Sequence, residues 1–179
     1  MGLDMYLYRA RKESDFEKAG ITIPLDEFEK HRDMYKALMP FLTKVDHLTP
    51  CYDIDKICQD FGLDRATIYL CFQSSDGERR FTDHAGNFAN LTADQVKKEY
   101  LIHKNITYYI CDLCEVYYWR KAYDVEDAIY EACNFEVENC GYYRMTQKML
   151  AAIKRKDPRF KERFHEDISQ KNIFYHEWY

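Results

Sequence analysis

The sequence predicts an α+β fold, in which a small mixed or antiparallel sheet carries several packed helices. Apolar and polar residues alternate near both ends of the chain, as they do in half-buried strands. Between these segments, apolar residues recur at steps of three and four, the spacing of amphipathic helices. The chain has 179 residues, so we expect a single domain over 1–179, with about 21–90 as a possible elaboration.

The composition is that of a globular protein, with 46% hydrophobic residues, 32% charged residues and only 6 glycines. The formal net charge of -5 argues against bulk attraction to nucleic acid, although a local basic patch could still supply it. No apolar run approaches the ~18 residues of a membrane span, and no signal peptide is evident at the start. Seven cysteines, an odd number, fit reduced thiols. We therefore expect a cytoplasmic protein that does not bind membranes and needs no cofactor.

The first strand is expected over residues 2–11, where Leu3, Met5 and Leu7 alternate with polar and aromatic residues. Asp4 shares the second face with Tyr6 and Tyr8, and an acidic residue is unusual within a strand. We interpret it as a solvent-side carboxylate or a site residue at a sheet edge. Further strands are expected over 105–111, 142–145 and 172–179.

The longest helix is expected over about 112–133. Asp112 stands where an N-cap belongs, and Glu115 follows at the spacing of a capping box. The apolar stripe of this helix is made of Cys114, Tyr118, Ala122, Val125, Ile129 and Ala132. Other helices are expected over 25–42 and 53–61, from Thr92 to about residue 101, after Thr146, and from Pro158 onward.

Residues 54–72 allow two interpretations. A helix-turn-helix would place Gly62 in the turn and would direct Arg65, Thr67 and Tyr69 into a major groove. A hairpin over 68–83 would instead turn at Gly77, between two runs of strand-forming residues. We favour the hairpin because threonine, isoleucine, tyrosine and phenylalanine in succession prefer strands.

Two chemical groupings carry weak signals. Cys111 and Cys114 form a C-x-x-C pair, but the remaining zinc-ligand candidates, Cys133 and Cys140, are too widely spaced for a standard site. Small buried thiols are the simpler explanation, and we expect no metal. Glu115, Arg120 and Lys121 could handle an anion or a carboxylate, or they could cap the helix and pair with acidic residues on a solvated face.

Three segments carry a resemblance to known proteins: MGLDMYLY at the start, EVYYWRKA at 115–122 and ENCGYY at 138–143. In this order they resemble a group of small proteins encoded by bacteriophages, prophages and bacteria, and 175–179 is similar to the aromatic ending of that group. At Tyr123 the chain departs from the group, which has asparagine there. The resemblance implies an origin and a shared binding surface. The residues that match its motifs are Asp4, Glu115, Trp119, Arg120, Lys121, Asn139, Cys140 and Gly141.

From these observations we expect a non-enzymatic binding protein of phage or mobile-element origin. Its partner would be a host protein or a small charged ligand, and counter-defence, such as inhibition of a CRISPR or nucleotide-signalling system, would fit. The first alternative is a helix-turn-helix regulator that binds nucleic acid. The second is a small hydrolase of a phosphorylated ligand that uses Asp4, Glu115, Arg120 and Lys121, although no nucleophile is identified.

Overall fold

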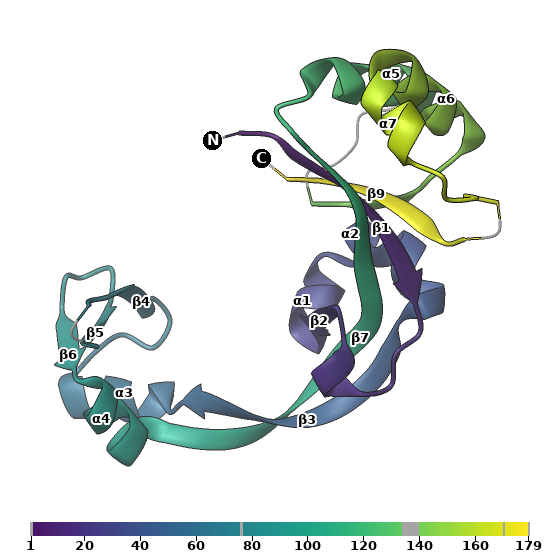
Figure 1. Cartoon of the computed structure of the whole chain (residues 1–179). Coiled ribbons are helices and arrows are strands. Elements are labelled where there is room, and N and C mark those ends of the chain that lie inside the picture. Colours follow the sequence, from purple (N-terminus) through teal and green to yellow (C-terminus); the bar gives the residue numbers. More distant parts are fainter. Residues whose placement is uncertain (1, 76, 134–139, 170, 179) are drawn as a thin grey trace. The chain divides into compact units, whose positions relative to one another are not determined.

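The computed structural model describes residues 2–75, 77–133, 140–169 and 171–178, and it confirms the α+β fold. The chain forms two compact units (Figure 1). The first unit consists of Met1–His47 and Thr107–Tyr179, and the second consists of Leu48–Ile106. The second unit is therefore inserted within the sequence of the first. No helix in the described parts of the chain is long and apolar enough to cross a membrane.

The first unit is built on a six-stranded sheet with the order β2-β7-β1-β9-β8, in which β3 also pairs with β7. Its strands are β1 (Asp4–Arg11), β2 (Ile21–Pro24), β3 (Thr43–Tyr52), β7 (Leu101–Arg120), β8 (Tyr142–Arg144) and β9 (Ile173–Trp178). The pairings of β7 with β2 and β1, of β1 with β9, and of β9 with β8 are antiparallel. Strands β3 and β7 continue into the second unit. The strands expected near both chain ends are confirmed.

Three helices cover one face of this sheet: α5 (Tyr123–Cys133), α6 (Gln147–Lys156) and α7 (Pro158–Arg163) (Figure 1). The alternation in β1 directs Leu3, Met5 and Leu7 into the core beneath them. Thr146 caps α6 through the Met149 N–H. Asp157, followed by Pro158 at the first helical position, caps α7. Both of these helix starts were predicted from the sequence.

The expectation of one helix over 112–133 is wrong in its first half. Residues up to Arg120 belong to β7, and α5 starts only at Tyr123. Asp112 is no helix cap, because it faces Arg11 across the sheet and the two side chains approach to 2.8 Å. The β1–β7 register shifts between Leu7 and Tyr8, which is a β-bulge. The extra residue breaks the two-residue alternation of β7, which is the pattern that indicates a strand.

The helix expected over 25–42 is also interrupted. It is divided into α1 (Leu25–Lys30), α2 (Arg32–Tyr35) and the 3-10 helix η2 (Lys36–Phe41), with a further 3-10 turn η1 at Phe16–Lys18. His31 leaves helical geometry with φ -120° and ψ 38°. The side chain of the N-cap residue, Pro24, makes no capping hydrogen bond. Pro40 lies inside η2, where its missing N–H disfavours a longer α-helix.

The second unit is a three-stranded antiparallel sheet of β4 (Tyr69–Gln73), β5 (Arg79–Thr82) and β6 (Phe88–Leu91). Its helices are α3 (Ile54–Phe61), α4 (Ala93–Gln95) and η3 (Val96–Tyr100). A core between helices and sheet contains Ile57, Cys58, Leu63, Phe81, Ala89, Leu91, Val96 and Tyr100. Asp53 caps α3 and Gly62 ends it in the left-handed conformation, as expected.

The hairpin over 68–83 is confirmed, and the helix-turn-helix is wrong. No second helix follows Gly62, since β4 starts at Tyr69. Arg65 pairs instead with Asp55 of α3, with 2.7 Å between Nε and Oδ1. The Thr67 hydroxyl lies 3.0 Å from Oδ2 of Asp64. These three proposed DNA-reading residues therefore lie in a turn and a strand rather than on a recognition helix.

Candidate binding surface

Most of the side chains that could bind a partner lie on the face of the first sheet that points away from α5, α6 and α7. Asp4, Tyr6 and Tyr8 alternate with the core residues of β1 and project to this side. Across the sheet, each of them faces a residue of β7 and a residue of β9. We call this surface the open sheet face; it comprises Asp4, Tyr6, Tyr8, Glu115, Tyr118, Arg120, Tyr142, His176 and Trp178.

On the side of the sheet opposite α5, α6 and α7, one end is covered by η2 and the other end is exposed. Ala10 and Phe174 are buried beneath Leu38 of η2. Toward the other end, Tyr118 is 42% exposed and Trp178 is 55% exposed. The face is therefore accessible where its charged residues lie.

Aromatic rings run across the open sheet face in a continuous row. The Tyr6 ring lies 5.0 Å from Tyr118 and 5.4 Å from Tyr8, as measured between centroids. His176 lies 5.9 Å from Tyr8 and stacks on Tyr142 at 4.3 Å with an interplanar angle of 14°. Rings at these separations attract one another and hold one another in place. The row is therefore a preorganised apolar platform.

The row continues beyond Tyr142 to the helices that follow β2. Tyr35 of α2 stacks on Tyr142 at 6.1 Å, and Phe28 of α1 lies 6.0 Å from Tyr35. Phe28 also lies 4.4 Å from Tyr109 of β7. A surface cavity of about 410 Å³ opens at this end, and it is lined by Leu25, Phe28, Glu29, Arg32 and Tyr109.

His176 contributes a hydrogen-bond acceptor to the middle of the row. Its Nδ1 lies 3.1 Å from the Gly141 carbonyl oxygen. Because a carbonyl only accepts hydrogen bonds, Nδ1 must carry the proton. Burial lowers the pKa of His176, so the neutral ring is favoured. Its Nε2 then keeps a lone pair that can accept a hydrogen bond.

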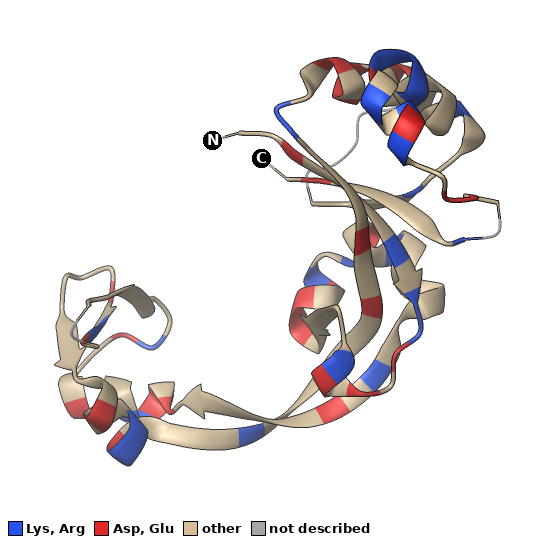
Figure 2. Cartoon of the chain, in the orientation of Figure 1, with Lys and Arg blue, Asp and Glu red and all other residues tan. Residues whose placement is uncertain are grey.

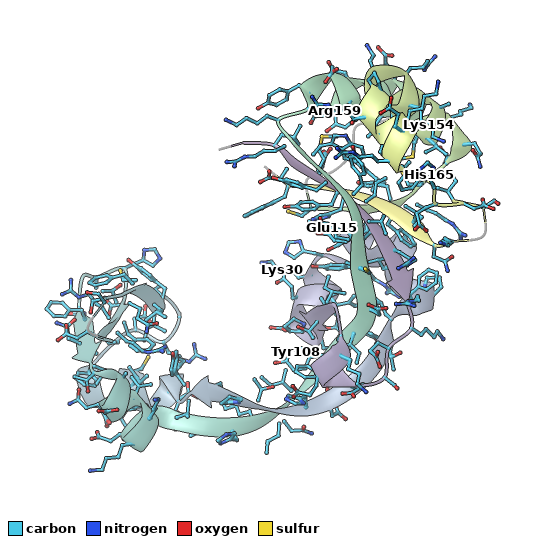
Figure 3. All side chains as sticks on the ribbon, in the orientation of Figure 1. Lys30, Tyr108, Glu115, Lys154, Arg159 and His165 are labelled. Atoms are coloured by element: carbon cyan, nitrogen blue, oxygen red, sulfur yellow. The ribbon has the colours of Figure 1, made fainter. Side chains whose placement is uncertain are left out.

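Charges of both signs border the aromatic row. The Tyr118 hydroxyl donates to Oδ1 of Asp4 at 2.5 Å, and this hydrogen bond raises the pKa of Tyr118. Nε of Arg120 lies 4.0 Å from the same oxygen, but 70% of its side chain is exposed. Glu115 is exposed on β7 (Figure 3), and no described lysine or arginine pairs with it. Arg120 and Glu115 are thus available to opposite charges on a partner.

The structure brings together three of the residues proposed from the sequence. Asp4, Glu115 and Arg120 all lie on the open sheet face. Cys140 and Gly141 lie beside it, immediately before β8: Cys140 has φ 67° and donates its N–H to the Glu177 carbonyl.

Two further proposed residues, Trp119 and Lys121, are not on this face. Trp119 points to the opposite side, is 7% exposed, and donates from Nε1 to Oδ2 of Asp157 at 2.7 Å. Lys121 follows the end of β7 with φ 55°, and its N–H donates to the Leu3 carbonyl. Asn139 lies outside the described residues.

Cys111 and Cys114 are not placed to bind one metal ion together. Cys111 and Cys114 are three residues apart on β7, so their side chains point to opposite faces. Burial raises the pKa of the Cys111 thiol to about 12, which opposes formation of the metal-binding thiolate. Burial also raises the pKa of Cys133 and Cys140. Within the described ranges, no group of three or more histidine, cysteine or acidic residues could hold a metal ion.

Sequence reasoning missed the aromatic members of the site. Tyr6, Tyr8, Tyr118, Tyr142 and His176 make the row, yet none of them was proposed as a binding residue. A signal was present, because the two β1 tyrosines alternate with core residues on a strand. What the sequence does not supply is the register that places strands from distant segments beside one another.

A second cluster of titratable groups contains two buried glutamates of the first unit. Glu177 is 0% exposed and Glu126 is 6% exposed. The Tyr130 hydroxyl lies 2.6 Å from Oε1 of Glu177 and 3.2 Å from Oε1 of Glu126. Tyr175 donates its hydroxyl to the other Glu177 oxygen at 2.6 Å. Burial is the main reason that the pKa values of both glutamates are raised.

The contact distances favour one arrangement of the protons within the cluster. A tyrosine hydroxyl has one hydrogen, and the shorter contact shows that Tyr130 donates it to Glu177. Burial and the neighbouring Glu177 raise the pKa of Glu126, which favours its neutral form, and a protonated Glu126 can donate to the Tyr130 oxygen. One carboxylate and one neutral acid would satisfy these contacts, and the cluster joins α5 to β9. Both carboxyl groups are buried, so we regard the cluster as structural.

A basic surface covers α6 and α7. Residues 147–163 include seven lysines and arginines but only Asp157 and Glu162 as acids. None of the seven forms an ion pair with a carboxylate in the described parts of the chain. Figure 2 shows this concentration of positive charge on the two helices, and Figure 3 labels Lys154 of α6 and Arg159 of α7. It lies on the helical side of the sheet and is separate from the open sheet face.

Comparisons with protein-family models, with curated proteins and with solved structures found no match for this chain.

Proposed function

We propose that this chain is a non-enzymatic binding protein and that the open sheet face is its binding surface for another protein. The observation that carries the proposal is the continuous row of aromatic rings, which is partly exposed on the sheet and is bordered by the exposed residues Tyr118, Arg120 and Glu115. Protein interfaces are enriched in tyrosine, tryptophan and arginine, because these side chains combine large contact area with hydrogen bonding.

The fixed geometry of the row favours tight binding. Each ring in the row already contacts a neighbour, as Tyr142 does with His176 at 4.3 Å. Side chains that are ordered before binding lose less conformational entropy when a partner docks. Tyrosine adds to this advantage, since it has few rotatable bonds for its contact area.

The size and polarity of the surface favour a protein over a small ligand. The aromatic row includes rings from four strands and two helices, so a small ligand would contact only part of it, whereas a protein partner can contact its full length. Arg120 and Glu115 would orient the partner by pairing with an acidic and a basic group respectively. The resemblance to phage proteins supports a bacterial host protein as this partner, and a counter-defence inhibitor is the role that we propose.

The test is affinity capture from a bacterial lysate, with the proteins quantified by mass spectrometry. Tagged wild type would be compared with Tyr118→Ala and Arg120→Glu, two exposed positions whose substitution leaves the core intact. Arg159→Glu is the matched control, because it makes the same charge change on exposed α7. We expect a host protein that is retained by wild type and the control and lost from both face variants. If every captured protein is retained by the face variants, the proposal is wrong.

A further inference from the structure

The three-stranded sheet of the second unit has one packed face and one exposed face. Phe81, Ala89 and Leu91 point inward to α3 and η3. The opposite face carries two cross-strand rows, in which Phe72, Arg80 and Asn90 are aligned, and Tyr69, Thr82 and Phe88 are aligned. We call this surface the outer face. Two of its phenyl rings, Phe72 and Phe88, are 48% and 56% exposed.

Arg80 lies between these two phenyl rings. Its guanidinium carbon is 5.1 Å from the centroid of Phe72 and 5.2 Å from that of Phe88. Nε donates to Oδ1 of Asn90 at 2.8 Å, which fixes the plane of the group. No carboxylate among the described residues pairs with Arg80. The two terminal nitrogens of the guanidinium are therefore oriented but not neutralised.

We propose that the outer face binds single-stranded nucleic acid. Bases would stack on Phe72 and Phe88, and the Arg80 guanidinium would bind a backbone phosphate between them. Charge complementarity supports this ligand, because the aligned residues of the outer face include Arg80 but no acidic residue. Flat aromatic surface and a fixed, unpaired cation match a ligand that alternates flat bases with anionic phosphates.

Single-stranded rather than duplex nucleic acid fits this chemistry. Bases within a duplex are stacked on one another and do not present their faces to protein rings. Duplex binding without base contacts depends on many phosphate contacts, whereas the outer face has one unpaired arginine between its rings. The surface is therefore suited to a short stretch of unpaired bases with little sequence preference.

The experiment measures the fluorescence anisotropy of a fluorescein-labelled oligothymidylate of about 12 nucleotides, titrated with the full-length protein. At low salt we expect saturable binding with a Kd of roughly 1–100 μM. Phe72→Ala and Phe88→Ala should each weaken binding by roughly 5- to 150-fold, the effect of losing one stacked base. Arg80→Ala should weaken binding and also lower the salt dependence of log K, by a slope of about 0.7.

The control variant is Lys148→Glu/Arg155→Glu/Arg159→Glu, which reverses charge on the basic helices of the first unit. Circular dichroism of each variant verifies folding, and an unlabelled duplex serves as competitor. Binding that survives in the control and is lost in the outer-face variants supports the proposal. Three results would overturn it: no saturable binding, equal competition by the duplex, or binding that depends on the helices instead of the outer face.

Discussion

The substitution Glu126→Gln should reduce the loss of folding stability that the first unit undergoes as pH rises. Tyr130 bridges Oε1 of Glu126 and Oε1 of Glu177 at 3.2 Å and 2.6 Å, so these two oxygens are at most about 5.8 Å apart. Two unit charges at that separation repel by about 3 kcal/mol at an effective dielectric constant of about 20. Glutamine is uncharged, and its NH₂ group can donate to the Tyr130 oxygen as the protonated acid does.

The sign of the effect follows from the raised pKa of Glu126. Above the ordinary glutamate pKa, the unfolded chain releases its proton while the folded protein retains it. Stability is therefore fully present at low pH and falls as the pH rises toward the folded pKa, by about 1.4 kcal/mol per pH unit. Glutamine does not titrate, so residue 126 no longer contributes to the pH dependence of stability. The pH dependence that remains comes from Glu177.

Urea unfolding between pH 4.5 and pH 8.5, followed by far-UV circular dichroism, measures this effect. We expect nearly equal stabilities at the lowest pH and an advantage of up to about 3 kcal/mol for Glu126→Gln at the highest. Glu131→Gln, on the exposed side of the same helix, should show no such divergence. A difference that does not change with pH, or a variant that becomes less stable as pH rises, would refute the proton assignment.

Three further predictions concern local packing. Gly20→Ala should destabilise the protein by about 1–3 kcal/mol in urea unfolding, because the new Cβ would lie 2.5 Å from a backbone nitrogen of β7; an unchanged midpoint would contradict the close approach of Gly20 to β7. Trp119→Phe should cost about 2 kcal/mol in the same assay, since it removes the indole hydrogen bond to Asp157. In timed alkylation with iodoacetamide, read by peptide mass spectrometry, exposed Cys71 should react before Cys111, whose pKa burial raises to about 12. Equal labelling rates would count against the burial of Cys111.

Local signals in the sequence predicted much of the fold. The alternation in β1, the Asp53 cap of α3, the Thr92 capping box and the Pro158 start of α7 are all formed by residues close together in the chain. Such features depend on nearby backbone geometry, so a sequence pattern is enough to locate them.

The candidate site could be predicted only in part, for a physical reason. Asp4, Glu115 and Arg120 were identified as residues, but their common face depends on pairing β1 with a strand more than 100 residues away. The β-bulge opposite Leu7 and Tyr8 also interrupts the alternation that indicates a strand, so the side to which Trp119 points could not be predicted. Register and bulges are set by tertiary packing, which local spacing does not determine.

Site-specific photo-crosslinking in living bacteria tests the open sheet face most directly. The photoreactive residue p-benzoylphenylalanine would replace Tyr118 on the open sheet face or, as a control, Arg159 on α7; both positions are exposed. We predict that irradiation yields a discrete adduct with one host protein from position 118, and that Arg120→Glu in the same chain reduces the yield. An adduct that forms only from position 159, or one that is unaffected by Arg120→Glu, would contradict the proposal that this face binds the partner.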